Sequence, residues 1–208
     1  MTEAEARERL DVPRETIDRL EAFVELLRAE NARQNLVSKA SLDAVWERHI
    51  LDSSQLVRFA PEQAGSWLDL GTGAGFPGLI IPLFHPADVL LVESRRLRAD
   101  FLRSAADALG ISGRVEIACA RLESLPARSF DVISARAFAP LAKLLALAER
   151  FATPETIWIL PKGRNAKSEL EAARSSWQGD FRLEPSLTDA EAGIVVASRV
   201  RQKPRGRR

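Results

Sequence analysis

The chain has 208 residues, of which 46% are hydrophobic and 28% are charged, and its formal net charge is +1. This length suits one domain with an extension, and the apolar content excludes a chain that is disordered throughout. Its longest apolar runs, such as 79–84, are too short to span a bilayer, and no secretory signal is visible. We expect a cytoplasmic protein with no membrane partner, and we expect a monomer.

Cys119 is the only cysteine, which excludes an internal disulfide and a cysteine-based metal cluster. We therefore predict no metal site, and a reducing cytoplasm suits this cysteine count. Because Cys119 follows an expected strand, we interpret it as a small apolar filler of the core.

Charge is unevenly distributed along the chain. Residues 1–30 carry nine acidic and five basic side chains, whereas residues 199–208 carry six basic and no acidic side chains. A basic tail can contact phosphates, since each neutralised phosphate releases counterions. Arg201, Lys203 and Arg205 are therefore candidate nucleic-acid contacts, and the alternative is a solvated, frayed terminus.

The first third of the chain has apolar residues at helical spacing. The pattern predicts a helix over 13–30, with Pro13 in its first turn, and a second helix over 41–59, capped by Ser41. Proline and glycine then interrupt the pattern, so we interpret residues 1–62 as a helical extension.

Strands and helices alternate beyond this extension. The expected strands are 67–70, 89–92, 115–117, 130–134, 156–160, 181–183 and 193–200. The expected helices are 78–84, 95–109, 140–150 and 166–177. This alternation predicts an α/β fold with a mostly parallel, seven-stranded sheet covered on both faces. We place this domain over 63–201 and a basic tail over 202–208.

A glycine-rich turn follows the first expected strand, where open α/β sheets bind their ligands. Gly71, Gly73 and Gly75 stand at a spacing of two, and glycine lets the backbone approach a ligand closely. A dinucleotide fingerprint would need a further glycine at the position of Phe76. The turn therefore disfavours a nicotinamide dinucleotide.

Two carboxylates accompany the turn. Asp69 would repel a pyrophosphate, but it can accept an ammonium or a bridging water. Glu93 closes the second strand, eighteen residues after Gly75, where it is well placed to accept both hydroxyls of a ribose. These features favour S-adenosylmethionine as the cofactor, and the alternative is a tight turn beside a surface glutamate.

With these residues in view, the chain resembles the bacterial small-subunit rRNA guanine-N7 methyltransferases, also called the glucose-inhibited division protein B family. The resemblance covers residues 35–163. It rests on Asn35–Leu36, Arg48–Ser53, Asp69–Gly78, Val92–Ser94, Arg121–Glu123, Ser134–Ala137 and Lys162–Gly163. The continuation of the turn from Gly73 to Gly78 and the segment 48–53 are its most specific parts.

The resemblance implies a Rossmann-like, class I S-adenosylmethionine-dependent methyltransferase. Its substrate would be N7 of a guanine in the decoding-region loop of 16S rRNA, within the small ribosomal subunit or its precursor. Cofactor contacts would come from Gly71, Phe76, Leu122–Glu123 and Arg136. The family often has a basic residue at the position of Leu97, so the role of that position is open here.

Guanine N7 carries a free lone pair, so its methylation requires positioning of the reactants more than proton transfer. Positioning can lower the activation free energy by about 7–11 kcal/mol. Arg136, Arg48, His49 and Asp52 are the catalytic candidates in this positioning sense. Arg136 can grip a carboxylate bidentately or lie near the RNA. Arg48 and Asp52 are four residues apart on the expected helix, and the alternative is a helix salt bridge beside a core histidine.

Arg48 and Lys162 are further candidate RNA contacts, although a solvated lysine is an equal alternative for Lys162. Phe76, Phe138 or Trp46 can stack on a splayed guanine. Core packing is favoured for Trp46, Trp67 and Trp158. The alternative function is a small-molecule methyltransferase on the same fold.

Overall fold

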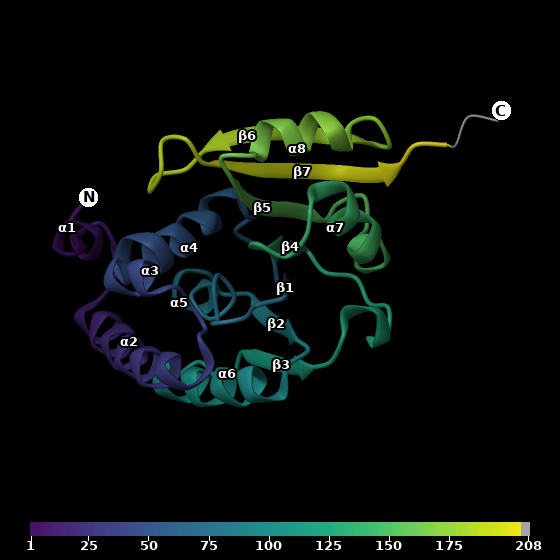
Figure 1. Ribbon diagram of the computed structural model, residues 1–208. Coiled ribbons are helices and arrows are strands. Elements are labelled where there is room, and N and C mark those ends of the chain that lie inside the picture. Colours follow the sequence, from purple (N-terminus) through teal and green to yellow (C-terminus); the bar gives the residue numbers. More distant parts are fainter. Residues whose placement is uncertain (205–208) are drawn as a thin grey trace.

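The computed structural model describes residues 1–204, and its centre is one seven-stranded sheet (Figure 1). The strands are β1 (Ser66–Leu70), β2 (Asp88–Glu93), β3 (Val115–Cys119), β4 (Val132–Ala135), β5 (Ile157–Gly163), β6 (Trp177–Pro185) and β7 (Gly193–Gln202). Their order is β3-β2-β1-β4-β5-β7-β6, and β7 runs antiparallel to both of its neighbours. Each of the seven expected strands has a counterpart, so the predicted mostly parallel sheet is confirmed.

Helices cover both faces of the sheet. The α-helices are α1 (Glu3–Glu8), α2 (Arg14–Gln34), α3 (Lys39–Asp43), α4 (Asp52–Ser54), α5 (Ile81–Phe84), α6 (Arg96–Leu109), α7 (Leu141–Ala148) and α8 (Ala166–Ala173). Shorter turns of other types are η1 (Trp46–Leu51), η2 (Gln55–Phe59), η3 (Leu122–Ser124) and η4 (Glu149–Phe151). No described helix is long and apolar enough to cross a membrane.

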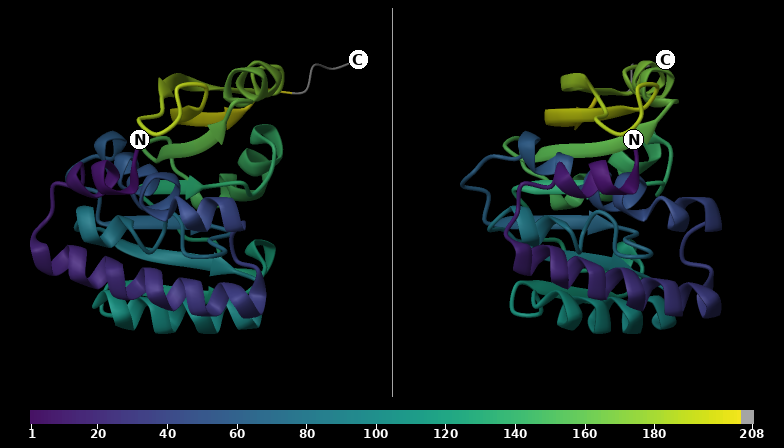
Figure 2. Two further views of the ribbon diagram at one scale, coloured as in Figure 1. Left: turned by 60° about the vertical axis from the view of Figure 1, so that its left-hand side comes forward. Right: turned by 90° about the vertical axis from the view of Figure 1, so that its left-hand side faces the viewer.

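Alternating side chains of the strands enter two separate cores. Trp67 and Leu91 pack with α1, α2, α5 and α6 on one face, and Leu68 and Trp158 pack with α7 and α8 on the other. Figure 2 shows α2 lying alongside α6, which joins the first part of the chain to the first core. The expected core positions of Trp46, Trp67 and Trp158 are confirmed.

The helix predicted over 41–59 is confirmed only in part, because the chain leaves helical geometry at Ala44 and the type of helix then changes within 45–59. Ser38, and not Ser41, caps α3, since its hydroxyl accepts the amide of Ser41 at 3.2 Å. A new helical segment of π type then begins at Trp46. The carboxylate of Glu3 accepts the amides of Trp46 and Glu47 at 3.1 and 3.3 Å. A cap supplied from 43 residues away leaves no local pattern in the sequence.

Two further helices are shorter than predicted. The helix expected over 78–84 is reduced to α5, because the amide of Gly78 donates to the Asp69 carboxylate and the chain before α5 stays in turns. The helix expected over 166–177 ends at Ala173. Trp177 begins β6, where its side chain is buried in the second core.

Candidate active site

The strand order reverses between β1 and β4, so the loops after these two strands diverge and leave a crevice. Leu70 and Ala135 are paired in register at this edge, and Gly71 and Arg136 follow them. Gly71 and Gly73 have φ angles of 63° and 60°, which non-glycine residues rarely adopt. A Cβ atom on Gly71 would lie 2.4 Å from the ring of Phe138, so the loop after β4 packs directly on the turn.

Asp69 is fully buried below the glycine-rich turn, and its carboxylate holds that turn in place. It accepts hydrogen bonds from Thr72 Oγ1 at 2.8 Å and from the amide of Gly78 at 3.2 Å. Its other oxygen accepts from Ser134 Oγ of β4 at 2.6 Å. Burial raises the pKa of Asp69 to about 6. The expected contact with an ammonium group is therefore wrong for this geometry, because residues of the chain already occupy the carboxylate.

Glu93 lies at the end of β2 and faces the same turn. One carboxylate oxygen accepts the amide of Gly73 at 3.2 Å, and the other accepts the amide of Arg95 at 2.8 Å. Each oxygen keeps a lone pair for a further donor. The amide of Ala120 donates to the carbonyl of Glu93 at 3.1 Å, which brings η3, with buried Leu122 and exposed Glu123, beside this strand end.

Two predicted cofactor contacts lie in the core instead. A Cβ atom on Gly75 would lie 2.4 Å from Leu79, so this glycine permits close packing below the turn. Phe76 is 3% exposed, stacks on His49 with ring centroids 4.7 Å apart, and meets Phe23 edge to face. The ring is therefore buried, and Phe76 cannot stack on a guanine.

Arg136 is held by groups from the broken helical region. Its guanidinium donates to the carbonyl of Arg48 at 3.2 Å, to Asp52 Oδ2 at 3.4 Å and to His49 Nδ1 at 3.0 Å. A guanidinium has no acceptor, so His49 Nδ1 must accept and its ring must be neutral. Burial, followed by the charges of Arg136 and Arg48, lowers the pKa of His49 to about 3, in agreement with a neutral ring.

The alternative interpretation of Arg48 and Asp52, a salt bridge along one helix, is wrong, and both residues line the cavity described below. Asp52 Oδ1 accepts from Gln55 Nε2 at 2.9 Å and from Thr188 Oγ1 at 2.8 Å, while Arg48 Nη1 lies 3.9 Å from Asp189 Oδ2. The π-type turn between Arg48 and Asp52 changes the spacing of side chains around the axis. Each partner therefore pairs with another part of the chain.

A cavity of about 640 Å³ opens beside Arg136. Its walls come from η1, the loop after β4, the end of β5 and the β6–β7 loop (186–192). Phe138, Pro140 and Pro161 form part of its apolar surface. Of the three aromatic residues considered for stacking, Phe138 alone lines this cavity and is partly exposed.

Several predicted RNA contacts lie away from this cavity or are already paired. Lys162 lines the cavity, but its side chain is 6% exposed, with Nζ 2.6 Å from the carbonyl of Ala139 and 3.1 Å from Glu169 Oε2. The prediction that Lys162 contacts a phosphate is therefore wrong in this geometry, and so is the alternative that its side chain is solvated.

Cys119, expected in the core, is exposed at the end of β3.

The basic tail leaves the sheet at the edge opposite the cavity. Gly193 of β7 pairs with Gly163 near the cavity, whereas Gln202 pairs with Trp177 at the far end of β7. At about 3.3 Å per residue, this places Arg201 and Lys203 roughly 25–35 Å from Gly193. These two side chains therefore lie far from the cavity, and their contact with RNA stays a prediction. Arg205 lies outside the described residues.

The β6–β7 loop is the part of the site that sequence reasoning missed. Its polar residues Ser186, Thr188 and Asp189 line the cavity. The only signal was a short polar run between two expected strands, and nothing in it indicated pairing with Asp52, which lies 136 residues away from Thr188.

This fold and site define a class, and solved structures show the same fold. The chain matches an O-methyltransferase from Bacillus cereus in complex with SAH, with a TM-score of 0.64, 14% identity, and 94% and 96% of the two chains covered. It also matches an RNA methyltransferase from Salinibacter ruber in complex with S-adenosyl-L-homocysteine, with a TM-score of 0.55, 17% identity, and 74% and 94% covered. The fold is that of the class I methyltransferases.

Sequence comparison identifies the family within this class. Residues 16–192 match the model of the GidB family, described as rRNA small subunit methyltransferase G. The ribosomal RNA small subunit methyltransferase G of Rhizorhabdus wittichii is 52% identical, over 100% of this chain and 98% of its own. The ribosomal RNA small subunit methyltransferase G of Zymomonas mobilis is 48% identical, over 98% of this chain and 96% of its own. The chain belongs to the GidB family, which confirms the resemblance found in the sequence.

The raised pKa of Asp69 predicts a pH-dependent contribution to stability. The folded protein binds this proton more tightly than the unfolded chain, so the contribution is present below pH about 4 and is lost as pH rises through about 6. The variant Asp69→Asn lacks this titration. The free energy of unfolding of the wild type, minus that of the variant, should fall by at most about 3 kcal/mol between pH 4 and 7 in urea titrations. A difference that stays constant with pH would contradict the assignment.

Proposed function

We propose that this protein transfers the methyl group of S-adenosylmethionine to N7 of a guanine in 16S rRNA, namely guanine 527 of the decoding-region loop. One observation carries the proposal: in a GidB-family chain, the glycine-rich turn with Glu93 directly adjoins a cavity lined by Arg136 and Phe138. The substrate is the small ribosomal subunit or its precursor, and the activity belongs to the cytoplasm. The monomeric state stays a prediction.

The turn and its neighbours fit S-adenosylmethionine, which supplies an electrophilic methyl group when it is bound. Gly71 and Gly73 are partly exposed and have no side chains to obstruct a ligand, and the Glu93 carboxylate retains lone pairs for ribose hydroxyls. Leu122–Glu123 lies beside Glu93 and can frame the adenine with backbone groups. Asp69 contributes indirectly, by holding the turn.

The residues around the cavity fit a reaction that removes no proton from its nucleophile. Guanine N7 attacks with its lone pair, so no general base is required. His49 is neutral and accepts from Arg136, whose guanidinium is also fixed by the Arg48 carbonyl and by Asp52. Arg136 retains N–H donors for a carboxylate or a phosphate. The four catalytic candidates therefore act by positioning.

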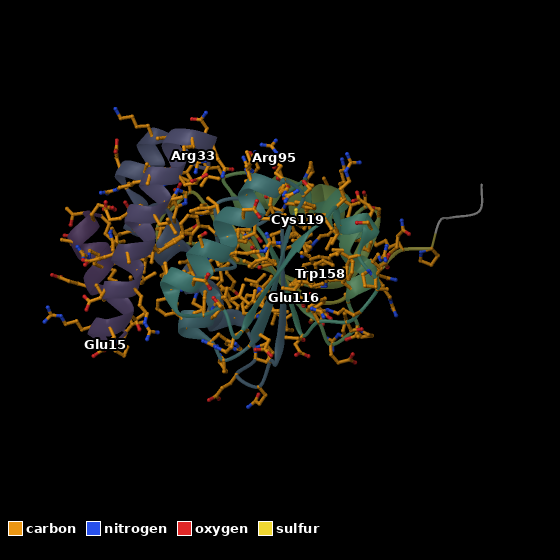
Figure 3. All side chains as sticks on the ribbon, turned by 90° about the horizontal axis from the view of Figure 1, so that it is seen from below. Glu15, Arg33, Arg95, Glu116, Cys119 and Trp158 are labelled. Atoms are coloured by element: carbon orange, nitrogen blue, oxygen red, sulfur yellow. The ribbon has the colours of Figure 1, made fainter. Side chains whose placement is uncertain are left out.

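The carboxyl ends of strands β1 to β5 form one edge of the sheet, which we call the site edge. Basic side chains on this edge favour RNA over a small molecule as the substrate. Figure 3 shows Arg33, at the end of α2, and Arg95, before α6, on one edge of the molecule, and Glu15, near the start of α2, on the opposite edge. The first turn of α6 has no acidic residue, although the amino end of a helix favours negative charge. A polyanionic partner would offset this unfavourable placement of positive charge. Arg48, which is half exposed at the cavity, can extend the contact.

Methyl transfer can be tested directly on ribosomal RNA. Purified protein and labelled S-adenosylmethionine should modify 16S rRNA, free or in small subunits, from cells that lack the enzyme. Mass spectrometry of digested RNA should locate one N7-methylguanosine in the decoding-region loop. Label on a metabolite, with none on ribosomal RNA, would support the small-molecule alternative instead.

Removal of the Glu93 carboxylate should weaken cofactor binding. Because hydrogen bonds to charged groups contribute about 1.5–3 kcal/mol, Glu93→Ala should raise the Kd for S-adenosylmethionine about 10- to 100-fold in calorimetric titrations. Glu116→Ala is the control and should leave the Kd unchanged, because Glu116 is exposed near the start of the neighbouring strand β3, whereas Glu93 pairs with Cys119 at the end of that strand. Equal affinity of the Glu93 variant and the wild type would remove the ribose assignment.

Reversal of one charge on the site edge should weaken RNA binding. Arg96 and Arg14 are both exposed and are the first residues of α6 and α2, so replacement by glutamate suits either helix. Arg96→Glu should lower rRNA affinity and reduce the slope of log affinity against log salt by about one. Arg14→Glu, at the far end of α2, should change neither quantity. The same loss in both variants would argue against a specific RNA-binding edge.

A further inference from the structure

Three carboxylates line the cavity beside Arg136, and two of them already have hydrogen-bond and ion-pair partners within the chain. Asp52 accepts from Arg136, Gln55 and Thr188. Glu169 lies 3.1 Å from Lys162 Nζ and accepts the amide of Leu141 at 2.7 Å, through the same oxygen. Both side chains therefore have a close cation and a structural donor.

Asp189 has fewer partners within the chain than Asp52 and Glu169. Its Oδ1 accepts the amide of Glu191 at 3.0 Å, which fixes the rotation of the carboxylate. Its Oδ2 lies 3.9 Å from Arg48 Nη1, which is beyond hydrogen-bond distance, and has no closer donor among the described residues. The side chain is about one quarter exposed on the cavity wall. Asp189 thus presents a partly exposed carboxylate with unused acceptor capacity to whatever fills the cavity.

The loop that carries Asp189 is held in a defined place. The amide of Leu187 donates to Gln55 Oε1 at 2.8 Å, and Thr188 Oγ1 donates to Asp52 Oδ1 at 2.8 Å. Asp52 in turn binds Arg136, so one carboxylate connects the loop to the residue after β4. Asp189 therefore belongs to a wall whose position relative to Arg136 is set before substrate binds.

The hydrogen-bond donors of guanine are complementary to a carboxylate on this wall. Guanine presents two adjacent N–H donors, N1–H and the 2-amino group, on the edge of the ring opposite N7. Adenine, cytosine and uracil have no pair of adjacent donors on that edge. A carboxylate accepts such a pair with two parallel hydrogen bonds. If N7 faces the glycine-rich turn, the opposite edge of the base faces away from it, across the cavity.

We propose that Asp189 is a specificity-determining residue that accepts N1–H and the 2-amino group of the target guanine. The inference rests on the function proposed above and extends it to base selection. A guanine splayed from its loop has this edge free, and unpaired bases in RNA are commonly recognised there. Phe138 and the two prolines of the cavity supply apolar surface for the faces of the base.

Inosine in place of the target guanosine tests this assignment. Inosine keeps N7 and N1–H but lacks the 2-amino group, so the reacting atom is unchanged. The substrate is 16S rRNA ligated with either nucleoside at the mapped position, in the form that the wild type accepts. The wild type should show a kcat/KM for guanosine about tenfold above that for inosine, as expected for one lost hydrogen bond to a charged group.

The variants Asp189→Ala and Asp189→Asn should lower kcat/KM for guanosine and bring its ratio to inosine close to one. The asparagine variant keeps the size of the side chain, so it remains informative if the alanine variant does not fold. Glu191→Ala is the matched control, because it removes an exposed carboxylate from the same loop and keeps the backbone amide that binds Asp189. It should retain the wild-type ratio.

Two outcomes separate the proposals. A wild type that methylates guanosine, with Asp189 variants that keep its preference over inosine, would overturn the role of Asp189 and leave the methyltransferase intact. A wild type that methylates neither RNA would overturn the proposed function and, with it, this inference.

Discussion

The buried carboxylate of Asp69 is the constraint on which the rest of the site depends. It joins the end of β1 to the glycine-rich turn through Thr72 and Gly78, and to β4 through Ser134. Ser134 also accepts the indole N–H of Trp67, so the network is anchored in the first core. An isolated charge at this depth would be costly, and three donors offset part of that cost. The result is a turn that keeps its shape without contact between Asp69 and the ligand.

A second constraint explains why a helical extension belongs to the active site. Glu3 caps η1, and the π-type turn directs Arg48, His49 and Asp52 toward the loop after β4. These residues then hold Arg136, while Asp52 and Gln55 hold the β6–β7 loop. Segments from the start, middle and end of the chain thus meet around one cavity. Their polar groups satisfy one another, which fixes the cavity before a base enters it.

The arrangement suits a reaction that needs alignment and not proton transfer. His49 is kept neutral by burial and by two nearby arginines, so it serves as a hydrogen-bond acceptor. Glu93 and the partly exposed glycines lie on one side of Arg136, and the cavity lies on the other. A cofactor and a splayed base would therefore approach each other across the point where the strand order reverses. Exposed arginines at this edge, such as Arg95 and Arg96, are suited to contacts with an RNA backbone.

The sequence alone determined the α/β class, the seven strands, the turn at Gly71 and Gly73, the position of Glu93 and the family. These features are local, because they follow from hydrophobic period, glycine spacing and contiguous motifs. Only the tertiary structure decided what surrounds Asp69, where the helix over 41–59 breaks, and that Gly75 and Phe76 belong to the core. It also placed the described tail residues at the edge of the sheet opposite the cavity and brought Asp189 to the cavity. Those features depend on donors and acceptors supplied from distant parts of the chain, such as Glu3 for Trp46 and Thr188 for Asp52, and no local pattern encodes such pairings.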